Sequence, residues 1–152
     1  SNDPYKIDPE HVGRCLILNQ ENFVIESDPK LQCLLPVDGL LSDRFGSNLD
    51  VDKLERTFKH YGFTTSTKTN VTHSSMKKEI YTATRDFTKD DSCFIVIIMS
   101  HGIKDAVYGS NSIPVYINDI EKIIQETENR HLLGKPKILI IQSCQGAPIQ
   151  KA

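Results

Sequence analysis

Two short runs of mostly branched apolar residues restrict the fold of this chain more than any other feature: Phe94–Met99 and Lys137–Ile141. Each has the length of a strand and lacks the alternation of polar and apolar residues that marks a half-exposed strand. Strands buried on both faces are typical of parallel sheets, because helices cover both sides of such sheets. The runs therefore predict an α/β domain built around a mostly parallel sheet.

The rest of the chain alternates between strand and helix patterns. Arg14–Asn19 and Phe63–Thr69 are predicted as further strands, and Tyr108–Val115 as a small hairpin. Helices are predicted from a cap at Asp50 to Gly62, over Thr72–Phe87, and from Asp119 to a stop at Gly134. This order predicts helices on both faces of the sheet and right-handed crossovers. The irregular segment 20–46 is long enough to be expected as a functional loop.

Length and charge limit the classes of function. The chain has 152 residues, enough for one domain, and we expect an extended tail at residues 1–13 followed by a single domain at 14–152. The formal net charge of −2 argues against a nucleic-acid-binding surface. The longest apolar run is far shorter than the roughly 20 residues that span a bilayer. We therefore expect neither nucleic acid nor a membrane as a partner.

The cysteines indicate a reducing compartment. Their spacing is long and irregular, and none forms a C-x-x-C pair. Cys15, Cys33 and Cys93 are predicted to lie in the core, and the chain is expected to be cytoplasmic. Asp90 and Asp91 are predicted to be solvated residues of a turn.

Chemically active residues follow the two buried strands. Ser100-His101-Gly102 comes directly after the first, and Gln142-Ser143-Cys144-Gln145-Gly146 after the second. Carboxyl ends of parallel strands form the edge at which such sheets bind ligands. A nearby imidazole can raise the small thiolate fraction of a cysteine and can then protonate a leaving amine. The backbone N–H groups of Gly102 and Cys144 can serve as oxyanion donors, so the pattern predicts acyl transfer.

A purely structural interpretation is the main alternative at this point. Cysteine is among the most buried residue types, and a single Cys or His at a strand end is usually part of the packing. Two such residues, each followed closely by a glycine, leave the two interpretations about equally supported. An unrelated doubly wound binding domain with an incidental cysteine and histidine remains compatible with the pattern.

The residues around the candidate pair resemble the catalytic segments of caspases, the aspartate-specific cysteine proteases. The caspase cysteine motif Q-A-C-[RQG]-G lies about 50 residues after the histidine, and here Cys144 follows His101 by 43 residues. The resemblance extends over most of the chain from Arg14 onward. Its other matching segments are Asp43–Gly46, Leu49–Asp52 with Leu54 and Phe58, Tyr108-Gly109 and Gly134–Lys137.

The resemblance implies a role for each matched residue. His101 would be the general acid and base, Cys144 the nucleophile, and Gly102 an oxyanion donor. Arg44 and Gln142 would line the pocket for the substrate's P1 aspartate, since a guanidinium matches a carboxylate with two parallel donors. The backbone carbonyl near Ser42 would orient the histidine. No metal or organic cofactor is implied.

The resemblance also implies partners that this chain does not supply. The fold would be caspase-like and completed by a separate small subunit, in a dimer of large–small heterodimers. The enzyme would be a zymogen that acts in apoptotic or inflammatory and immune proteolysis, with adaptor or inhibitor proteins as further partners. The 152-residue chain alone is expected to be inactive. The alternative within the family is a catalytically silent homologue that regulates an active caspase by heterodimerisation.

Two residues of the cysteine motif bear on these expectations. Ser143 stands where the family usually has alanine, which adds a hydroxyl beside the thiol. Gln145 follows the cysteine in place of arginine, as in initiator rather than executioner caspases.

Overall fold

The computed structural model describes the backbone of residues 9–145 and the side chains of residues 9–143. The first eight residues of the predicted tail, and residues 146–152 of the predicted domain, lie outside this range. The described strands and helices are β1 (Gly13–Asn19), the 3-10 helix η1 (Pro29–Leu34), α1 (Ser47–His60), β2 (Phe63–Thr69), α2 (His73–Asp86), β3 (Cys93–Ile103), β4 (Ala106–Tyr108), β5 (Pro114–Tyr116), α3 (Ile117–Gln125) and β6 (Lys137–Gln145).

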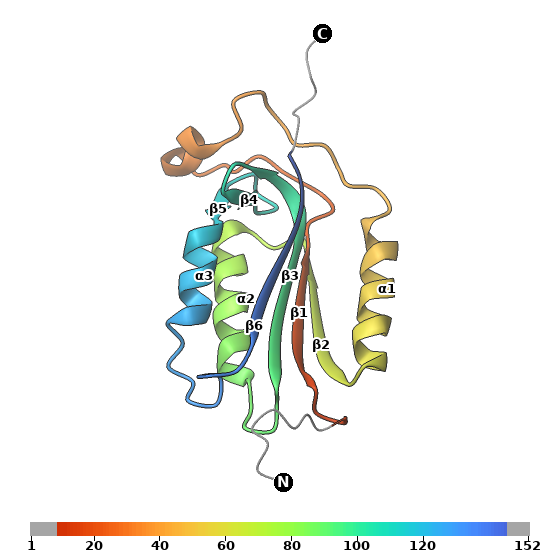
Figure 1. The fold of residues 1–152 in the computed structure, drawn as a ribbon. Helices are drawn as coiled ribbons and strands as arrows, with labels where there is room; N and C mark the ends of the chain where they lie inside the picture. Colours follow the sequence, from red (N-terminus) through yellow and green to blue (C-terminus); the bar gives the residue numbers. More distant parts are fainter. Residues whose placement is uncertain (1–8, 146–152) are drawn as a thin grey trace.

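The sheet is mostly parallel, as predicted. β2, β1, β3 and β6 lie side by side in that order and all run in the same direction. β4 and β5 form an antiparallel hairpin that pairs with the end of β3. Figure 1 shows α1 on one face of the sheet and α2 and α3 on the other. The predicted α/β fold with helices on both faces is therefore confirmed.

Residues of β3 fill the core on both faces of the sheet. Phe94 and Val96 pack in the cluster that includes α2 and α3, whereas Ile95 and Ile97 pack in the cluster that includes α1. The division follows from strand geometry, since successive side chains point to opposite faces. All four side chains are buried, and complete burial of such a side chain stabilises the fold by about 1.5–3 kcal/mol.

Several element boundaries differ from the predictions. α1 begins at Ser47 after the N-cap Gly46, so Asp50 does not cap the helix. It lies in the first turn, where a carboxylate still favours the positive end of the helix dipole. α3 ends at Gln125, well before the predicted stop at Gly134. The predicted end of α1 is confirmed: Gly62 has a φ of 91° and its N–H bonds to the Lys59 carbonyl.

Cys33 and Asp91 occupy environments opposite to those predicted. Cys33 lies in η1 and is exposed rather than buried, because that short helix buries none of its residues. Asp91 is buried rather than solvated, and its carboxylate accepts a 2.8 Å hydrogen bond from Nε of Arg14. Burial alone would raise the pKa of Asp91, but hydrogen bonds from Thr88 and Arg14 outweigh it and lower the pKa. A polar residue in a turn can therefore be part of the core.

None of the helices within residues 9–145 has both the length and the apolar character needed to cross a bilayer.

Candidate active site

The two motifs lie next to each other at the carboxyl ends of β3 and β6. These strands are longer than predicted: β3 includes all three residues of the first motif, and β6 includes residues 142–145 of the second. Their pairing continues to the end of β6. The Cα atoms of His101 and Cys144 are register partners, and those of Gly102 and Gln145 are the next pair. Neighbouring strands are about 4.8 Å apart. The backbone thus brings the predicted base and the predicted nucleophile to adjacent positions on adjacent strands.

The His101 ring is held from two sides. Its Nε2 lies 2.7 Å from the backbone carbonyl oxygen of Ser42, in the loop before α1. Its centroid lies 5.0 Å from that of the Phe23 ring. The residue is only 8% exposed, and its Nδ1 is buried with no hydrogen-bond partner among the described residues. One ring nitrogen is therefore anchored, and the other has no partner among the residues that the structure describes.

Position 102 requires glycine because the backbone is crowded there. A Cβ on Gly102 would lie 2.8 Å from the carbonyl oxygen of Ala106 and 3.0 Å from Cβ of Ser143. The first distance is shorter than real Cβ contacts, and a backbone oxygen cannot move aside as a flexible side chain can. The predicted oxyanion donor therefore has no side chain between its backbone and a bound substrate.

Arg44 is fixed at the end of β1 by two hydrogen bonds. Its Nη1 donates to Oδ1 of Asn19 at 3.0 Å and to the carbonyl oxygen of Gln20 at 2.7 Å. Asn19 is fully buried, and its Nδ2 donates in turn to the Ser47 hydroxyl at the start of α1. Arg44 is half-buried, and the position of its guanidinium is defined by the sheet and by α1 together.

Gln142 lies in the same row of register partners across the sheet as Asn19, the residue that binds Arg44. Asn19 is the register partner of Met99, and Met99 is the register partner of Gln142. Met99 and His101 are two residues apart on β3 and therefore face the same side of the sheet. Gln142 therefore lies at one end of this row, and Arg44 is hydrogen-bonded to Asn19 at the other end.

Asn19 and Phe23 contribute to the site, although neither was singled out from the sequence. Asn19 ends an apolar strand, and a polar residue at that point is an available signal for a group that lines the carboxyl edge. Phe23 lies in the irregular loop, where no periodicity marks it. Only the fold shows that its ring meets His101.

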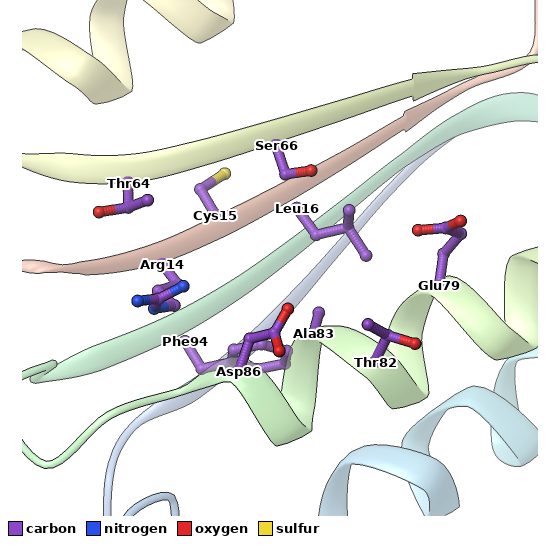
Figure 2. A pocket seen from close by; sticks show the side chains of 10 residues that line it. All are labelled: Arg14, Cys15, Leu16, Thr64, Ser66, Glu79, Thr82, Ala83, Asp86 and Phe94. Carbon is purple, nitrogen blue, oxygen red and sulfur yellow. The ribbon is translucent and has the colours of Figure 1, made fainter.

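A separate cavity of about 80 Å³ lies far from this edge (Figure 2). It lies between residues of β1, β2, β3 and α2, and its lining includes Arg14, Thr64, Glu79 and Asp86. Arg14 pairs in register with Phe94, near the amino-terminal end of β3. Cys15 also lines the cavity, where desolvation, reinforced by the nearby Cys93, raises the pKa of its thiol to about 12. With this pKa the Cys15 thiol stays protonated near neutral pH and is not a nucleophile.

No group of three or more His, Cys, Asp or Glu side chains within residues 9–143 is arranged to hold a metal ion.

Comparisons with known proteins agree with the geometry. The family model described as the caspase domain matches residues 12–152. Caspase-8 of Drosophila pseudoobscura pseudoobscura is 36% identical over 136 residues, which are 90% of this chain and 26% of that protein. Caspase-9 of Homo sapiens is 33% identical over 149 residues, which are 93% of this chain and 33% of that protein.

A solved structure shows the same relationship. The crystal structure of caspase-1 from Spodoptera frugiperda aligns with a TM-score of 0.75 at 26% identity. The alignment covers 95% of this chain and 52% of that one. The chain therefore spans at most about half the length of these three relatives.

Proposed function

Because the chain belongs to the caspase family, we propose that it is the large-subunit part of a cysteine endopeptidase that cleaves peptide bonds after aspartate. The observation that carries the proposal is the register pairing of His101 with Cys144 on neighbouring parallel strands. An incidental cysteine and histidine have no reason to meet in this way. The pairing is what a nucleophile and its proton carrier require.

In the proposed reaction, Nδ1 of His101 takes the proton of the Cys144 thiol, and the sulfur attacks the carbonyl carbon of the P1 aspartate. The N–H groups of Gly102 and Cys144 stabilise the resulting oxyanion. When the tetrahedral intermediate collapses, the C–N bond breaks and the leaving amine takes a proton from His101. A thioester remains. Water then attacks the thioester while His101 accepts a proton from that water. The C–S bond breaks, His101 returns the proton to the sulfur, and the products are the new carboxyl terminus and the free thiol.

The anchoring of His101 supports this assignment of roles. A carbonyl oxygen can only accept, so the contact with Ser42 is a hydrogen bond only when Nε2 carries the proton. In the neutral ring, Nδ1 is then the nitrogen with a free lone pair, and it is the nitrogen without a partner among the described residues. We assign Nδ1 as the atom that exchanges a proton with Cys144.

The P1 pocket is assigned to Arg44 and Gln142. The two bonds of Nη1 to Asn19 and Gln20 fix the cation before substrate arrives, so little side-chain entropy is lost on binding. A fixed guanidinium offers a carboxylate two parallel N–H donors. Gln142 would add an amide donor from the other end of the row.

The exposed side of β6 supports the proposal that a small subunit completes the enzyme. Within residues 9–145, β6 pairs only with β3. Ile138 and Ile140 on this strand remain 44% and 42% exposed. An unpaired edge strand with exposed isoleucines is prone to aggregate unless another strand or layer covers it. We assign that role to the small subunit, within a dimer of large–small heterodimers.

The setting proposed for this activity follows from the family alone. We propose a cytoplasmic zymogen that acts in apoptotic or inflammatory signalling, with proteins cleaved after aspartate as its substrates.

The test uses the full-length protein assembled with its small subunit. A tetrapeptide that ends in an aspartyl aminocoumarin amide should be cleaved, and the Cys144→Ala variant should lose this activity. Cys33→Ala is the matched control, because Cys33 is an exposed thiol far from the pair in sequence. An aspartyl fluoromethyl ketone should label Cys144 and spare Cys33.

The same experiment separates the silent-homologue alternative. If the assembled protein neither cleaves the amide nor reacts with the ketone, the endopeptidase proposal fails. Regulation of an active caspase by heterodimerisation would then be the better account.

A further inference from the structure

An apolar groove of about 400 Å³ lies between the loop that carries η1 and the β4–β5 hairpin. This volume is in the range of sites that bind small molecules or side chains of a peptide. One charged residue, Asp38, contributes to the lining. The apolar side chains that define the groove are Leu34, Val37, Leu41, Ile103, Tyr108 and Tyr116.

Several apolar side chains that line the groove are exposed to solvent. Leu34 and Ile103 are 43% and 42% exposed, Tyr116 is 52% exposed and Val37 is fully exposed. Single exposed apolar residues are ordinary, but a concave group of them usually marks a binding surface. The feature to be explained is what fills it.

The wall formed by the loop is held in place without a ligand. The amides of Val24 and Glu26 donate to the carbonyl oxygens of Ser110 and Asn111, at 2.8 and 3.1 Å. Nε2 of Gln32 in η1 donates to the Glu26 carbonyl at 2.7 Å. These bonds hold the segment that leads into the wall, so less ordering is needed when a ligand binds, which favours affinity.

The groove is continuous with the candidate active site. Leu41 directly precedes Ser42, whose carbonyl anchors His101, and Ile103 directly follows Gly102. Leu41 and Tyr108 pack in one cluster with Phe23, and the Phe23 ring contacts the His101 ring. The groove therefore begins beside the imidazole.

The loop between β1 and α1 contacts the groove, the imidazole and the end of β1 one after another. From Leu41 in the groove it passes Ser42 at His101 and reaches Arg44, which is bonded to the end of β1. Figure 1 shows this loop running from η1, beside the β4–β5 hairpin, across to α1 on the other side of the sheet. Arg44 thus lies toward the α1 side of the loop, and the groove lies toward the hairpin side.

The chemistry of the proposed reaction determines the direction in which a bound substrate chain runs along this loop. Arg44 binds the P1 aspartate and so holds the acyl part of the substrate. The leaving amine lies at the His101 imidazole, which protonates it. The chain beyond the scissile bond must continue past His101, away from Arg44. The groove is the concave apolar surface that it meets there.

We infer that this groove binds the substrate segment that follows the scissile bond and selects an apolar side chain at the first or second position after it. The inference rests on the proposed function and deepens it, because it adds selection on the leaving-group side to selection for aspartate.

The test compares two kinds of substrate on the full-length assembled enzyme. Internally quenched peptides share one sequence through the P1 aspartate and carry Leu or Ser at the first or second position after it. An aminocoumarin amide of the same sequence has no residue after the scissile bond. We expect Leu to raise kcat/KM over Ser by about tenfold or more at one of the two positions, as apolar pockets typically do.

Groove variants make the test specific. Leu34→Ser and Tyr116→Ser should bring the Leu-to-Ser ratio close to 1 and leave the rate on the aminocoumarin amide unchanged. Tyr81→Ser is the matched control, since Tyr81 is a similarly exposed tyrosine on α2 outside the groove. Because the amide reports folding and catalysis, a lower ratio with an unchanged amide rate assigns the effect to the groove.

The test distinguishes failure of this inference from failure of the proposed function. Cleavage of the amide with a Leu-to-Ser ratio near 1 in the unmodified enzyme overturns the inference and leaves the proposed function intact. A high ratio that survives both groove variants overturns it as well. If neither the amide nor any peptide is cleaved, the proposed function fails and the inference fails with it.

Discussion

Nε2 of His101 lies 2.7 Å from the carbonyl oxygen of Ser42, a residue 59 positions earlier in the chain. The acceptor is a backbone atom, so its presence does not depend on the side chain at position 42. The position of this carbonyl depends instead on the path of the loop between β1 and α1. The hydrogen bond from the Arg44 amide to the Glu21 carbonyl helps to fix that path. The orientation of the candidate base is therefore a property of the fold.

Replacement of His101 tests its role directly. We expect His101→Asn to lower kcat/KM on an aspartyl amide by about 10²- to 10⁴-fold, the usual contribution of a general acid and base. Steady-state kinetics of the assembled enzyme would measure this. His60→Asn is the control, since His60 is exposed at the end of α1. A His101→Asn enzyme within threefold of the unmodified rate would contradict the assignment.

Arg44 is expected to set the preference for aspartate. Arg44→Ala leaves the bound carboxylate without its cation, so transition-state binding should weaken by about 3–5 kcal/mol, or roughly 10²- to 10⁴-fold in kcat/KM. The ratio of rates for Asp and Asn at P1 should fall toward 1. Arg56→Ala on the exposed face of α1 is the matched control. Unchanged selectivity in the Arg44 variant would refute the pocket assignment.

The four cysteines should react with iodoacetamide at very different rates. Burial raises the pKa of the Cys93 thiol, and desolvation raises that of Cys15 to about 12, so both are almost wholly protonated near neutral pH. Because the thiolate is the nucleophile, both should be nearly inert until the protein unfolds. Cys33 is exposed and should react at an ordinary rate.

Cys144 should be the fastest of the four if His101 activates it. Timed alkylation of the assembled protein followed by peptide mass spectrometry gives all four rates in one sample. Alkylation of Cys144 no faster than that of Cys33, with the pH profile of a free thiol, would favour the unrelated binding domain over the protease.

The sequence was sufficient to predict the alternation of strands and helices along the chain and the edge of the sheet at which the motifs lie. Strands such as Phe94–Met99 are recognised because burial on both faces demands a continuous apolar run. The continuation of β3 to Ile103 was not predictable in this way, since Ser100, His101 and Gly102 break the apolar pattern. Pairing with β6 and, at the last two residues, with β4 maintains the strand there, and that pairing is visible only in three dimensions.

Contacts between distant segments account for most other differences. Asp91 resembles a solvated turn residue until Arg14, 77 positions away, is brought to its carboxylate. Phe23 has no local signal because its neighbour in space is His101. Cys33 sits beside Leu34 and Leu35 in a pattern that resembles a core segment, yet η1 lies on the surface and buries no residue. Local patterns record periodicity, and these residues are defined by tertiary contacts.

Asp91 should make the stability of the fold depend on acid pH. Its pKa is lower in the folded protein than in the unfolded chain, so the ionised carboxylate stabilises the fold. That contribution is complete above the unfolded-state pKa of about 3.9 and is lost as the pH falls through the lower folded-state value. Asp91→Asn should lower the free energy of unfolding at pH 7 by about 1–3 kcal/mol.

Urea denaturation at a series of pH values measures this effect. The difference between Asp91→Asn and the unmodified protein should shrink as the pH falls below 4. The adjacent Asp90 is exposed, so Asp90→Asn is a closely matched control that should change little. Equal effects of the two substitutions at pH 7 would show that the Arg14 pair does not contribute to stability.

The exposed isoleucines of β6 are expected to govern assembly with the small subunit. Ile138→Lys with Ile140→Lys places two charges on a surface that the proposal buries, so association should weaken by at least about tenfold. Because both side chains are more than two-fifths exposed in this chain, its far-UV circular dichroism should be unchanged. Light scattering on mixtures of the separately produced subunits would measure association. Tyr61→Lys is the control, because Tyr61 is another exposed apolar residue and lies directly after α1. Normal assembly of the double variant would mean that this side of β6 faces solvent in the enzyme, and the small subunit would have to bind elsewhere.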